Sequence, residues 1–334
     1  MSATQLSPLL FPLLRQLSDG KFHSGQALAQ HYQLSRSTVF NLIQQADKLG
    51  LRIHAVHGRG YRLVDEMSWL DLQDLRTRLL AVGQDYLIHA QDQIDSTNSA
   101  LFAQALAGAP HRSVLYADYQ YAGRGRRGRS WQAPPGGGLA FSVLWRFEQG
   151  VNQLSGLSVV IGLALARALA QCCPAIEKLP VKIKWPNDVL AGYRKLAGVL
   201  VEAQGEMDGP SFAVIGIGVN QRLPARFREE IDQAVVDMDE MGARVNRAEV
   251  MAVILTELST AMAEFARTGM RSALQEWPRW HAHEGRQVML RSPDGTSHGG
   301  LVSGLDQAGN LLLKMPDGSI RQFGAGEVSL RPLP

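Results

Sequence analysis

The sequence predicts an α+β protein with three consecutive domains, and three observations support this prediction. Residues 1–65 show helical apolar spacing followed by a short alternating stretch. Residues 66–283 mix helical and strand signals, and residues 284–334 are short apolar runs separated by turn residues. The chain has 334 residues, of which 45% are hydrophobic, so it is long enough to bury a sizeable core.

The first domain is predicted to be a winged helix-turn-helix. Ser24 and Ser35 can each cap a short helix, and Tyr32–Leu34 provide the turn between them. The helix Ser35–Gln44 is the candidate recognition helix. The stretch after it alternates apolar and polar residues around the turn His57–Gly60, which is typical of a β-hairpin wing.

This domain is locally basic, with seven Lys and Arg residues against three Asp residues. Net charge for the whole chain is only +3, so the placement of charge matters more than its total. A three-helix protein-interaction module is the alternative, but the basic balance and the wing favour DNA binding. The side chains that we expect to contact DNA are Ser24, Ser35, Arg36, Ser37, Thr38, Asn41 and Arg59.

The central domain is predicted to be a mixed α/β core. A helix over Asn98–Leu106 can be capped by Ser96 or Thr97, and a polar stretch, Gln221–Asp237, is predicted to be a loop. The other predicted helices are Asn152–Gln171 and Arg247–Ala266, and the predicted strands are Ser113–Gln120, Gly136–Trp145, Leu179–Trp185, Leu196–Glu202 and Phe212–Val219.

The last domain is predicted to be a small antiparallel barrel. Turn residues interrupt its apolar runs at Pro293–Gly295, Ala308–Asn310 and Pro316–Gly318. Turns at this spacing are typical of short, sequentially paired strands.

The loop Gly123–Trp131, GRGRRGRSW, has four arginines and three glycines in nine residues. Glycine lets the backbone approach a ligand closely, and arginine supplies forked donors that match phosphate and carboxylate oxygens. Such a run is often a disordered nucleic-acid-binding segment or a solvated loop. Here the apolar strands on both sides favour a binding site for an anionic ligand on a rigid scaffold.

Two further motifs lie downstream. KWPND (Lys184–Asp188) places a lysine at the end of a strand, where it suits a phosphate or carboxylate oxygen; the alternative is a surface lysine before a structural turn. In GIGVN (Gly216–Asn220), Gly216 and Gly218 share one face of a strand. That bare face suits either a flat ligand or close helix packing, and the sequence leaves both open.

Composition excludes several classes of protein. The only cysteines, Cys172 and Cys173, are adjacent, which predicts reduced core thiols, and no Cys/His cluster has metal-ligand spacing. The start of the chain has no signal-peptide pattern. The longest apolar stretch, Gly156–Ala166, is far shorter than the roughly 20 residues that span a membrane. These features predict a soluble, cytoplasmic protein without membrane contact.

Taken in order, GRGRRGRSW, KWPND, KLAGVLVE (Lys195–Glu202) and GIGVN resemble the biotin–protein ligases. The helix-turn-helix makes the chain similar to the bifunctional class, biotin ligase and biotin-operon repressor, over nearly its whole length. The resemblance implies a class II synthetase-like core and an SH3-like C-terminal barrel. It also implies that biotin and ATP, with Mg²⁺, give biotinyl-5′-adenylate, and that a lysine of the biotin carboxyl carrier protein then accepts the biotinyl group. A homodimer with bound adenylate would bind the biotin operator DNA.

The resemblance also implies roles for individual residues. It places Ser96, Thr97 and Asn98 at the biotin head group, and Gly216 and Gly218 beside biotin as a flat wall. The other implied biotin contacts are Gln120, Gly123, Arg124, Gly125 and Arg126, and the implied catalytic residues are Lys184, Arg126 and Asp188. No metal site made by protein residues alone is implied, since Mg²⁺ would arrive with ATP.

One position departs from the related repressor-ligases, which tend to carry an adenine-stacking tryptophan where Val235 stands here. Aromatic stacking on a base is worth about 1–3 kcal/mol, so adenine binding would be weaker or would use another residue. Two alternatives are a lipoate–protein ligase and a metabolite-sensing repressor with an inactive ligase core. The DNA-binding unit and the arginine loop disfavour the first, and the presence of Arg124, Arg126 and Lys184 disfavours the second.

Overall fold

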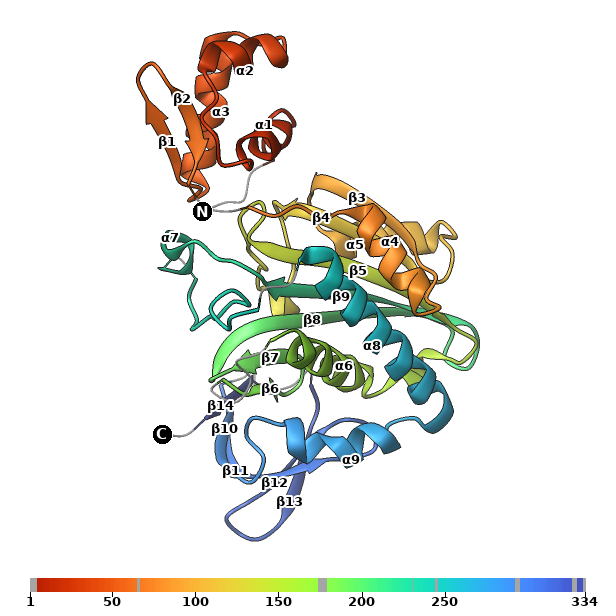
Figure 1. Cartoon of the computed structure of the whole chain (residues 1–334). Coiled ribbons are helices and arrows are strands. Elements are labelled where there is room, and N and C mark those ends of the chain that lie inside the picture. Colours follow the sequence, from red (N-terminus) through yellow and green to blue (C-terminus); the bar gives the residue numbers. More distant parts are fainter. Residues whose placement is uncertain are drawn as a thin grey trace.

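A computed structural model describes residues 5–64, 67–173, 179–229, 231–243, 246–291, 295–325 and 329–332. The chain forms an N-terminal helical unit with a hairpin, a central sheet with helices, and a C-terminal sheet, in this order (Figure 1). The predicted α+β class and the three-part architecture are confirmed. The predicted boundary after residue 65 lies outside the described residues.

The N-terminal unit is a helix-turn-helix with a wing, as predicted. Ser24 caps the second helix through Ala27 N, and Ser35 caps the third through Thr38 N, both at 3.0 Å. These hydrogen bonds satisfy backbone donors that the first turn of a helix leaves unpaired. The elements are α1 (Leu10–Leu17), α2 (Gly25–His31), α3 (Arg36–Lys48) and the antiparallel wing strands β1 (Ile53–Val56) and β2 (Gly60–Leu63).

This unit packs on the central domain through both apolar and polar contacts. Tyr119 of the central sheet belongs to the same buried cluster as α1 and α3. Arg15 of α1 forms salt bridges with Asp92 (2.5 Å) and with Asp118 (3.0 Å), of which Asp118 is buried. The N-terminal unit therefore has a fixed contact with the central sheet.

The central domain is a seven-stranded sheet with the order β3-β4-β5-β9-β8-β7-β6. All neighbouring strands are antiparallel except β3 and β4, which are parallel. All five predicted central strands are present, and the sequence analysis missed β3 and β7. The strands are β3 (Leu87–Ile94), β4 (Ser113–Gln120), β5 (Gly138–Phe147), β6 (Val181–Lys184), β7 (Asp188–Ala191), β8 (Arg194–Gly205) and β9 (Ser211–Asn220).

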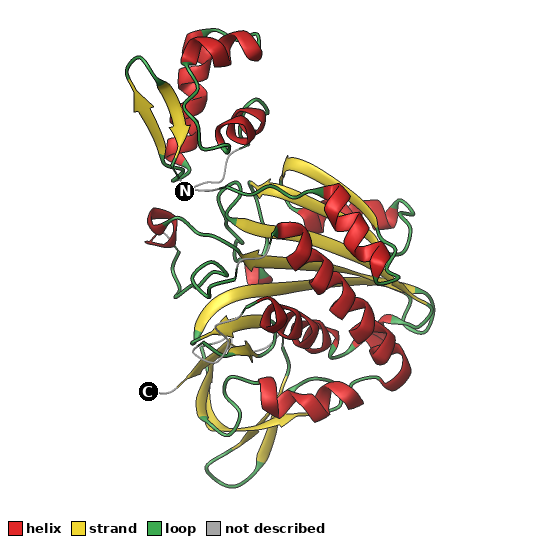
Figure 2. Cartoon of the chain, in the orientation of Figure 1, coloured by secondary structure: helices red, strands yellow, loops and turns green. Residues whose placement is uncertain are grey.

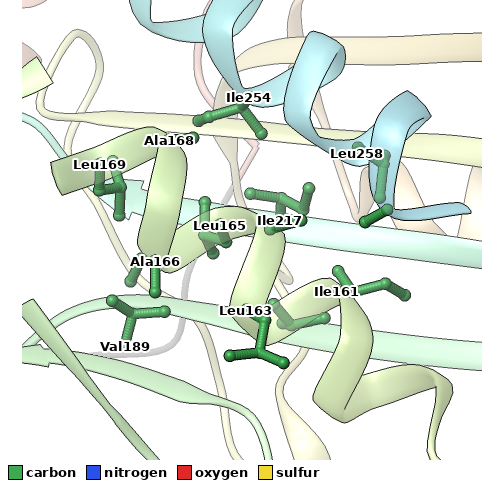
Figure 3. Close-up of a cluster of buried hydrophobic side chains, with 14 of the residues drawn as sticks. Ile161, Leu163, Leu165, Ala166, Ala168, Leu169, Val189, Ile217, Ile254 and Leu258 are labelled. Carbon is green, nitrogen blue, oxygen red and sulfur yellow. The ribbon is translucent and has the colours of Figure 1, made fainter. Parts of the chain in front are cut away.

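Helices cover both faces of this sheet (Figure 2). Leucines of α6 pack against Ile217 of β9 and Ile254 of α8 in the main core (Figure 3). On the other face, α5 packs on Leu115 of β4 and Leu144 of β5 in a separate buried cluster. The helices are α4 (Leu72–Ala81), α5 (Thr97–Leu106), α6 (Leu157–Cys172), α7 (Ala225–Glu229), α8 (Arg247–Thr268) and α9 (Arg271–Trp280). In the described ranges no helix is both long and apolar enough to cross a membrane.

Two predictions for the central domain are wrong in detail. The helix predicted from Asn152 begins only at Leu157, because Gly156 has a φ of +81° and separates α6 from a short 3₁₀ turn, η2 (Val151–Leu154). The stretch predicted as the loop Gln221–Asp237 contains α7, a five-residue helix too short to show a clear apolar period.

Cys172 and Cys173 are free, buried thiols, and burial raises their pKa to about 12 and about 11.

The C-terminal unit is an antiparallel five-stranded sheet with the order β13-β12-β11-β10-β14. The predicted turns at Ala308–Asn310 and Pro316–Gly318 are present, whereas Pro293 and Asp294 lie outside the described residues. The described pairings leave β13 and β14 as edges, so closure into a barrel stays a prediction. The strands are β10 (Gln287–Arg291), β11 (Ser297–Leu305), β12 (Leu311–Lys314), β13 (Ile320–Phe323) and β14 (Ser329–Pro332).

Candidate functional site

A cavity of about 860 Å³ lies where the arginine loop meets the central sheet. It is bounded by the start of α5, the β6–β7 hairpin, parts of β8 and β9, residues 231–235 and Ala325 of the C-terminal unit. Of the twelve residues that the sequence analysis assigned to biotin, adenylate or catalysis, all but Gly123 line it: Ser96, Thr97, Asn98, Gln120, Arg124, Gly125, Arg126, Lys184, Asp188, Gly216 and Gly218. Residues far apart in the sequence are thus brought to one cavity.

One end of the cavity is polar and buried. Thr97 donates its backbone N–H to Gln120 Oε1 (2.8 Å), and its hydroxyl lies 2.9 Å from Ser142 Oγ. Ser142, on β5, is fully buried and lines the cavity, although the sequence analysis did not identify it. Several neutral donors and acceptors in a dry pocket suit an uncharged polar ring.

Asn98 completes this end of the cavity. Its side chain is 3% exposed, and its Nδ2 donates to Glu202 Oε2 at 2.5 Å. Its Oδ1 is buried and has no hydrogen-bond partner among the described residues. A Cβ at Gly216 would lie 2.7 Å from that oxygen, so only glycine leaves room for the amide there.

The arginine loop is folded back on itself. The backbone N–H of Trp131 donates to Gly123 O (2.8 Å), and Gly125 N–H donates to Arg129 O (2.7 Å). A Cβ at Gly123 would lie 2.4 Å from Trp131 O, which explains a glycine at this position although it does not line the cavity. The turn η1 (Arg126–Gly128) forms the tip of the loop.

Arg126 ties this loop to two other segments. Its Nη1 donates to Asn187 Oδ1 at 3.0 Å, and its Nη2 donates to the carbonyl of Ala325 in the C-terminal unit. Burial lowers the pKa of its guanidinium, the charge of Arg127 lowers it further, and Asp188 opposes both. Asn187 is held in turn by its Nδ2, which donates to Val199 O at 2.8 Å, so it serves as a structural link between the loop and β8.

Trp131 lies against the glycine wall that GIGVN predicted. A Cβ at Gly218 would lie 2.3 Å from the indole, and one at Gly198, its cross-strand partner, would lie 3.4 Å from it. The face of β8 and β9 that the sequence left open between ligand and helix therefore faces the cavity and accepts a flat ring. Trp131 itself was quoted within the loop but not assigned to the site.

Lys195 is a second residue that the sequence analysis missed. Its ammonium lies 2.8 Å from Asp188 Oδ1 and 5.5 Å from the centre of the Trp131 ring. The motif KLAGVLVE contained this signal, because Lys195 lies at the start of a strand whose glycine, Gly198, faces the same wall. Lys184 and Lys195 both line the cavity, so two ammonium groups lie on the side that β6, β7 and β8 form.

KWPND forms the turn of the β6–β7 hairpin, with Lys184 paired to Asp188. Trp185 is 1% exposed, and its indole N–H donates to Gly309 O of the C-terminal unit (3.0 Å). This buried anchor fixes the hairpin, so that the side chains of Lys184 and Asp188 line the cavity.

Near Lys184 lies His283, which is 2% exposed and also lines the cavity. Burial lowers the pKa of its imidazole to about 4, with smaller contributions from His281, Lys184 and Arg286. The ring is therefore neutral at pH 7. Within the described ranges, no three His, Cys, Asp or Glu side chains are grouped so that they could hold a metal ion.

Val235, for which the resemblance led us to expect an adenine-stacking tryptophan, lines the cavity. Its segment is paired with β8, because Lys195 N–H donates to Ala234 O (2.9 Å) and Val236 N–H donates to Lys195 O (3.0 Å). The ammonium of Lys195, the residue paired with this segment, lies 5.5 Å from the centre of the Trp131 ring.

The predicted DNA-contacting residues lie apart from the cavity, on the N-terminal unit. Arg36, Ser37 and Thr38 form the first turn of α3, and Arg36 and Asn41 are exposed. Ser24 and Ser35 serve as helix caps. At the tip of the wing, Arg59 stacks on Phe22, with its guanidinium carbon 4.3 Å from the ring centre.

Comparisons with known proteins identify the same three parts. Models of an HTH domain, the Biotin/lipoate A/B protein ligase family and the Biotin protein ligase C terminal domain match residues 10–62, 90–220 and 283–331. The chain is 34% identical over 319 residues to the bifunctional ligase/repressor BirA of Escherichia coli (strain K12), covering 96% of each chain. It is 34% identical to a biotin–[acetyl-CoA-carboxylase] ligase of Paracoccus denitrificans, covering 67% of this chain and 92% of that protein.

Solved structures show the same likeness. The biotin protein ligase of Aquifex aeolicus in complex with biotin and ATP superposes with a TM-score of 0.59 at 28% identity, covering 74% of this chain and 99% of that one. A point mutant of that ligase, in complex with biotin, gives a TM-score of 0.61 at 28% identity, covering 74% of this chain and 98% of that one.

Proposed function

Since this chain belongs to the family of bifunctional ligase/repressor BirA proteins, we propose that it condenses biotin with ATP to biotinyl-5′-adenylate, with release of pyrophosphate. A lysine of the biotin carboxyl carrier protein then accepts the biotinyl group, and AMP leaves. The observation that carries this proposal is the polarity of the cavity. Buried hydroxyl and amide groups of Thr97, Asn98 and Ser142 line one end, and the other end holds Arg126, Lys184 and Lys195. Biotin has an uncharged cyclic urea at one end and a carboxylate at the other, so the two ends match.

The positively charged side chains of the cavity lower the main barrier to adenylate formation, which is charge repulsion. A carboxylate must approach the α-phosphorus of ATP, and the two anions repel each other. Ammonium and guanidinium groups fixed around the reacting oxygens stabilise the negative charge that builds up in the transition state. We assign this role to Lys184 and Arg126, and we add Lys195.

The carboxylate of Asp188 is a suitable ligand for a Mg²⁺ ion that arrives with the phosphates of ATP. Magnesium is commonly bound by one or two carboxylates together with substrate phosphates, and Asp188 is a carboxylate on the cavity wall beside Lys184. Bound there, the ion would neutralise phosphate charge.

The loop has a protective role in this proposal. A mixed anhydride hydrolyses if water reaches it, so the site should close while the adenylate waits for its acceptor. Arg126 links the loop to Asn187 and to Ala325, which keeps the loop over the cavity. Trp131 on the glycine wall is our candidate for the adenine contact that Val235 does not offer.

We further propose that the adenylate-bound protein forms a homodimer that binds the biotin operator through α3 and the wing, and that it acts in the cytoplasm. Support comes from the match to the HTH domain, the exposed Arg36 and Asn41 on α3, and the basic wing.

The decisive experiment is the incubation of the protein with ATP, Mg²⁺, biotin and a carrier domain, followed by intact-mass measurement. A mass gain with biotin but not with lipoate supports the ligase and excludes the lipoate ligase. No mass gain in the presence of operator binding would instead indicate a repressor with an inactive core.

Lys184→Ala tests the chemistry within the site. We expect the variant to keep its fold and to lose about 1.5–3 kcal/mol of transition-state stabilisation, because it loses a charged contact in a site shielded from water. Pyrophosphate release at the wild-type rate would remove Lys184 from the mechanism.

A further inference from the structure

Glu202, the last residue of KLAGVLVE, lies behind the wall of the cavity and contacts two residues that line it. Its Oε2 accepts from Asn98 Nδ2 at 2.5 Å and from Arg124 Nη1 at 3.1 Å. Its Oε1 accepts from Arg124 Nη2 at 2.6 Å. The carboxylate is 27% exposed and is not part of the cavity lining.

This contact fixes the orientation of the Asn98 amide. An ionised carboxylate only accepts hydrogen bonds, so the NH₂ of Asn98 must face Glu202 and its carbonyl oxygen must face away. That oxygen points at Gly216, where a Cβ would lie 2.7 Å from it, and it has no partner among the described residues. Because a buried acceptor without a donor is costly, the position is prepared for an N–H group of a ligand.

We propose that Glu202 is a positioning residue for the head group of the substrate: it holds the Asn98 carbonyl oxygen ready to accept from an N–H of a cyclic urea. This inference rests on the proposed function and adds a reason for its selectivity. The urea ring of biotin carries two N–H donors, whereas the dithiolane ring of lipoate carries none. A site that presents an unpaired buried acceptor discriminates strongly against a ligand that lacks the donor.

Glu202 joins the same recognition element to the loop. Arg124, the first arginine of GRGRRGRSW, forms a two-point ion pair with it and also donates to Ser99 Oγ at 3.0 Å. Head-group recognition and loop closure therefore depend on one carboxylate. A neutral amide replaces it poorly, because its NH₂ group would face Arg124 Nη2, which is itself a donor, and because it lacks the negative charge that pairs with the guanidinium.

Glu202→Gln is the first test, with Glu257→Gln as the matched control. Glu257, on α8, also pairs with an arginine (Arg167 Nε, 2.9 Å) and is 22% exposed, but it lies outside the cavity. We expect Glu202→Gln to raise the KM for biotin about tenfold or more, with a smaller change in kcat and in the KM for ATP. Glu257→Gln should leave all three close to wild type.

A double variant separates positioning from a general structural role. Asn98→Asp alone places two carboxylates against each other and should bind biotin poorly. In the double variant Asn98→Asp with Glu202→Gln, the side-chain NH₂ at position 202 can donate to one carboxylate oxygen at position 98. The other oxygen at position 98 then faces Gly216 as an acceptor, as in the wild type. We expect the double variant to have a biotin KM at least about tenfold lower than that of Asn98→Asp alone.

Biotin affinity by calorimetry and the thermal midpoint are measured for every variant, so that a folding defect is recognised. The inference is overturned if Glu202→Gln matches Glu257→Gln in its KM for biotin, or if the double variant is no better than Asn98→Asp. If the wild-type protein neither binds nor turns over biotin, the proposed function fails and the inference fails with it. Wild-type turnover combined with an unchanged KM in Glu202→Gln overturns the inference alone.

Discussion

Replacement of Arg126 by glycine should turn a selective enzyme into one that releases its activated intermediate. Arg126 makes two hydrogen bonds that join the loop to the rest of the protein, one to Asn187 Oδ1 at 3.0 Å and one to the Ala325 carbonyl. Glycine removes both contacts and adds backbone freedom at the tip of the loop.

The size of the effect follows from these contacts. A hydrogen bond from a charged group contributes about 1.5–3 kcal/mol. Because each 1.4 kcal/mol is a factor of ten in an equilibrium constant, the loss of one such net contribution raises the open fraction of the loop by about 10- to 150-fold. An open loop releases biotinyl-adenylate into solution, where it acylates any accessible lysine.

The assay is a labelling reaction with ATP, Mg²⁺, biotin, carrier domain and serum albumin, followed by a biotin blot. Wild type should label the carrier almost alone, and Arg126→Gly should label albumin as well. Arg127→Gly is the matched control, since it removes the same charge from the next residue, whose φ of +56° already suits glycine, and leaves the Arg126 contacts in place. Equal selectivity for the carrier in wild type and Arg126→Gly would refute the role of this arginine as a clamp.

Three further predictions concern stability and DNA. Arg247 is 1% exposed and donates to Gly138 O (2.7 Å) and to the Tyr116 hydroxyl (3.2 Å). Arg247→Met leaves these buried groups without their donor and should lower the free energy of unfolding by about 3–5 kcal/mol. Thermal unfolding should show no comparable drop for Arg267→Ala, at an exposed position of the same helix. In the folded protein the pKa of His283 is about 4, below its usual 6.5, so between these pH values the unfolded chain binds a proton that the folded chain does not. The free energy of unfolding should therefore fall as the pH drops from about 6.5 to 4, and denaturant titrations should show a smaller fall for His283→Phe. Arg36→Ala should weaken operator binding and reduce its salt dependence, which a series of binding measurements at increasing salt would reveal, and an unchanged salt slope would contradict a phosphate contact.

Much of the fold was predictable because it depends on interactions between residues that are close together in the sequence, such as helix capping. Ser24, Ser35 and Ser96 cap helices where the sequence suggested, since each hydroxyl meets a backbone donor three residues away. The start of α6 was not predictable in this way. Apolar spacing continues across Gly156, and only the left-handed conformation of that glycine shows that the chain turns before the helix begins.

The site was predictable where a motif concentrates one kind of chemistry, and less so where distant segments meet. The residue types of the arginine loop and of KWPND were enough to predict that both segments belong to the site. Lys195 and Ser142 did not, because a single lysine or serine in a strand carries no signal until the sheet places it against Asp188 or Thr97. The position of Trp131 could not be predicted for the same reason, because the space that it fills exists only where Gly198 and Gly218 pair across β8 and β9.

Strand β4 connects the two functional surfaces of this protein. Its last residue, Gln120, accepts from the backbone of Thr97 at the head-group end of the cavity. Two residues earlier, Asp118 accepts from Arg15 of the DNA-binding unit (3.0 Å), and it also accepts from the Tyr116 hydroxyl (2.6 Å). Positions two apart in a strand share a face, so the residue that accepts from Thr97 and the residue that anchors α1 lie on one short segment of β4. Burial raises the pKa of Asp118, and the hydrogen bond from Tyr116 and the charges of Arg247 and Arg15 oppose this rise, so the contact with α1 helps to keep the Asp118 carboxylate ionised.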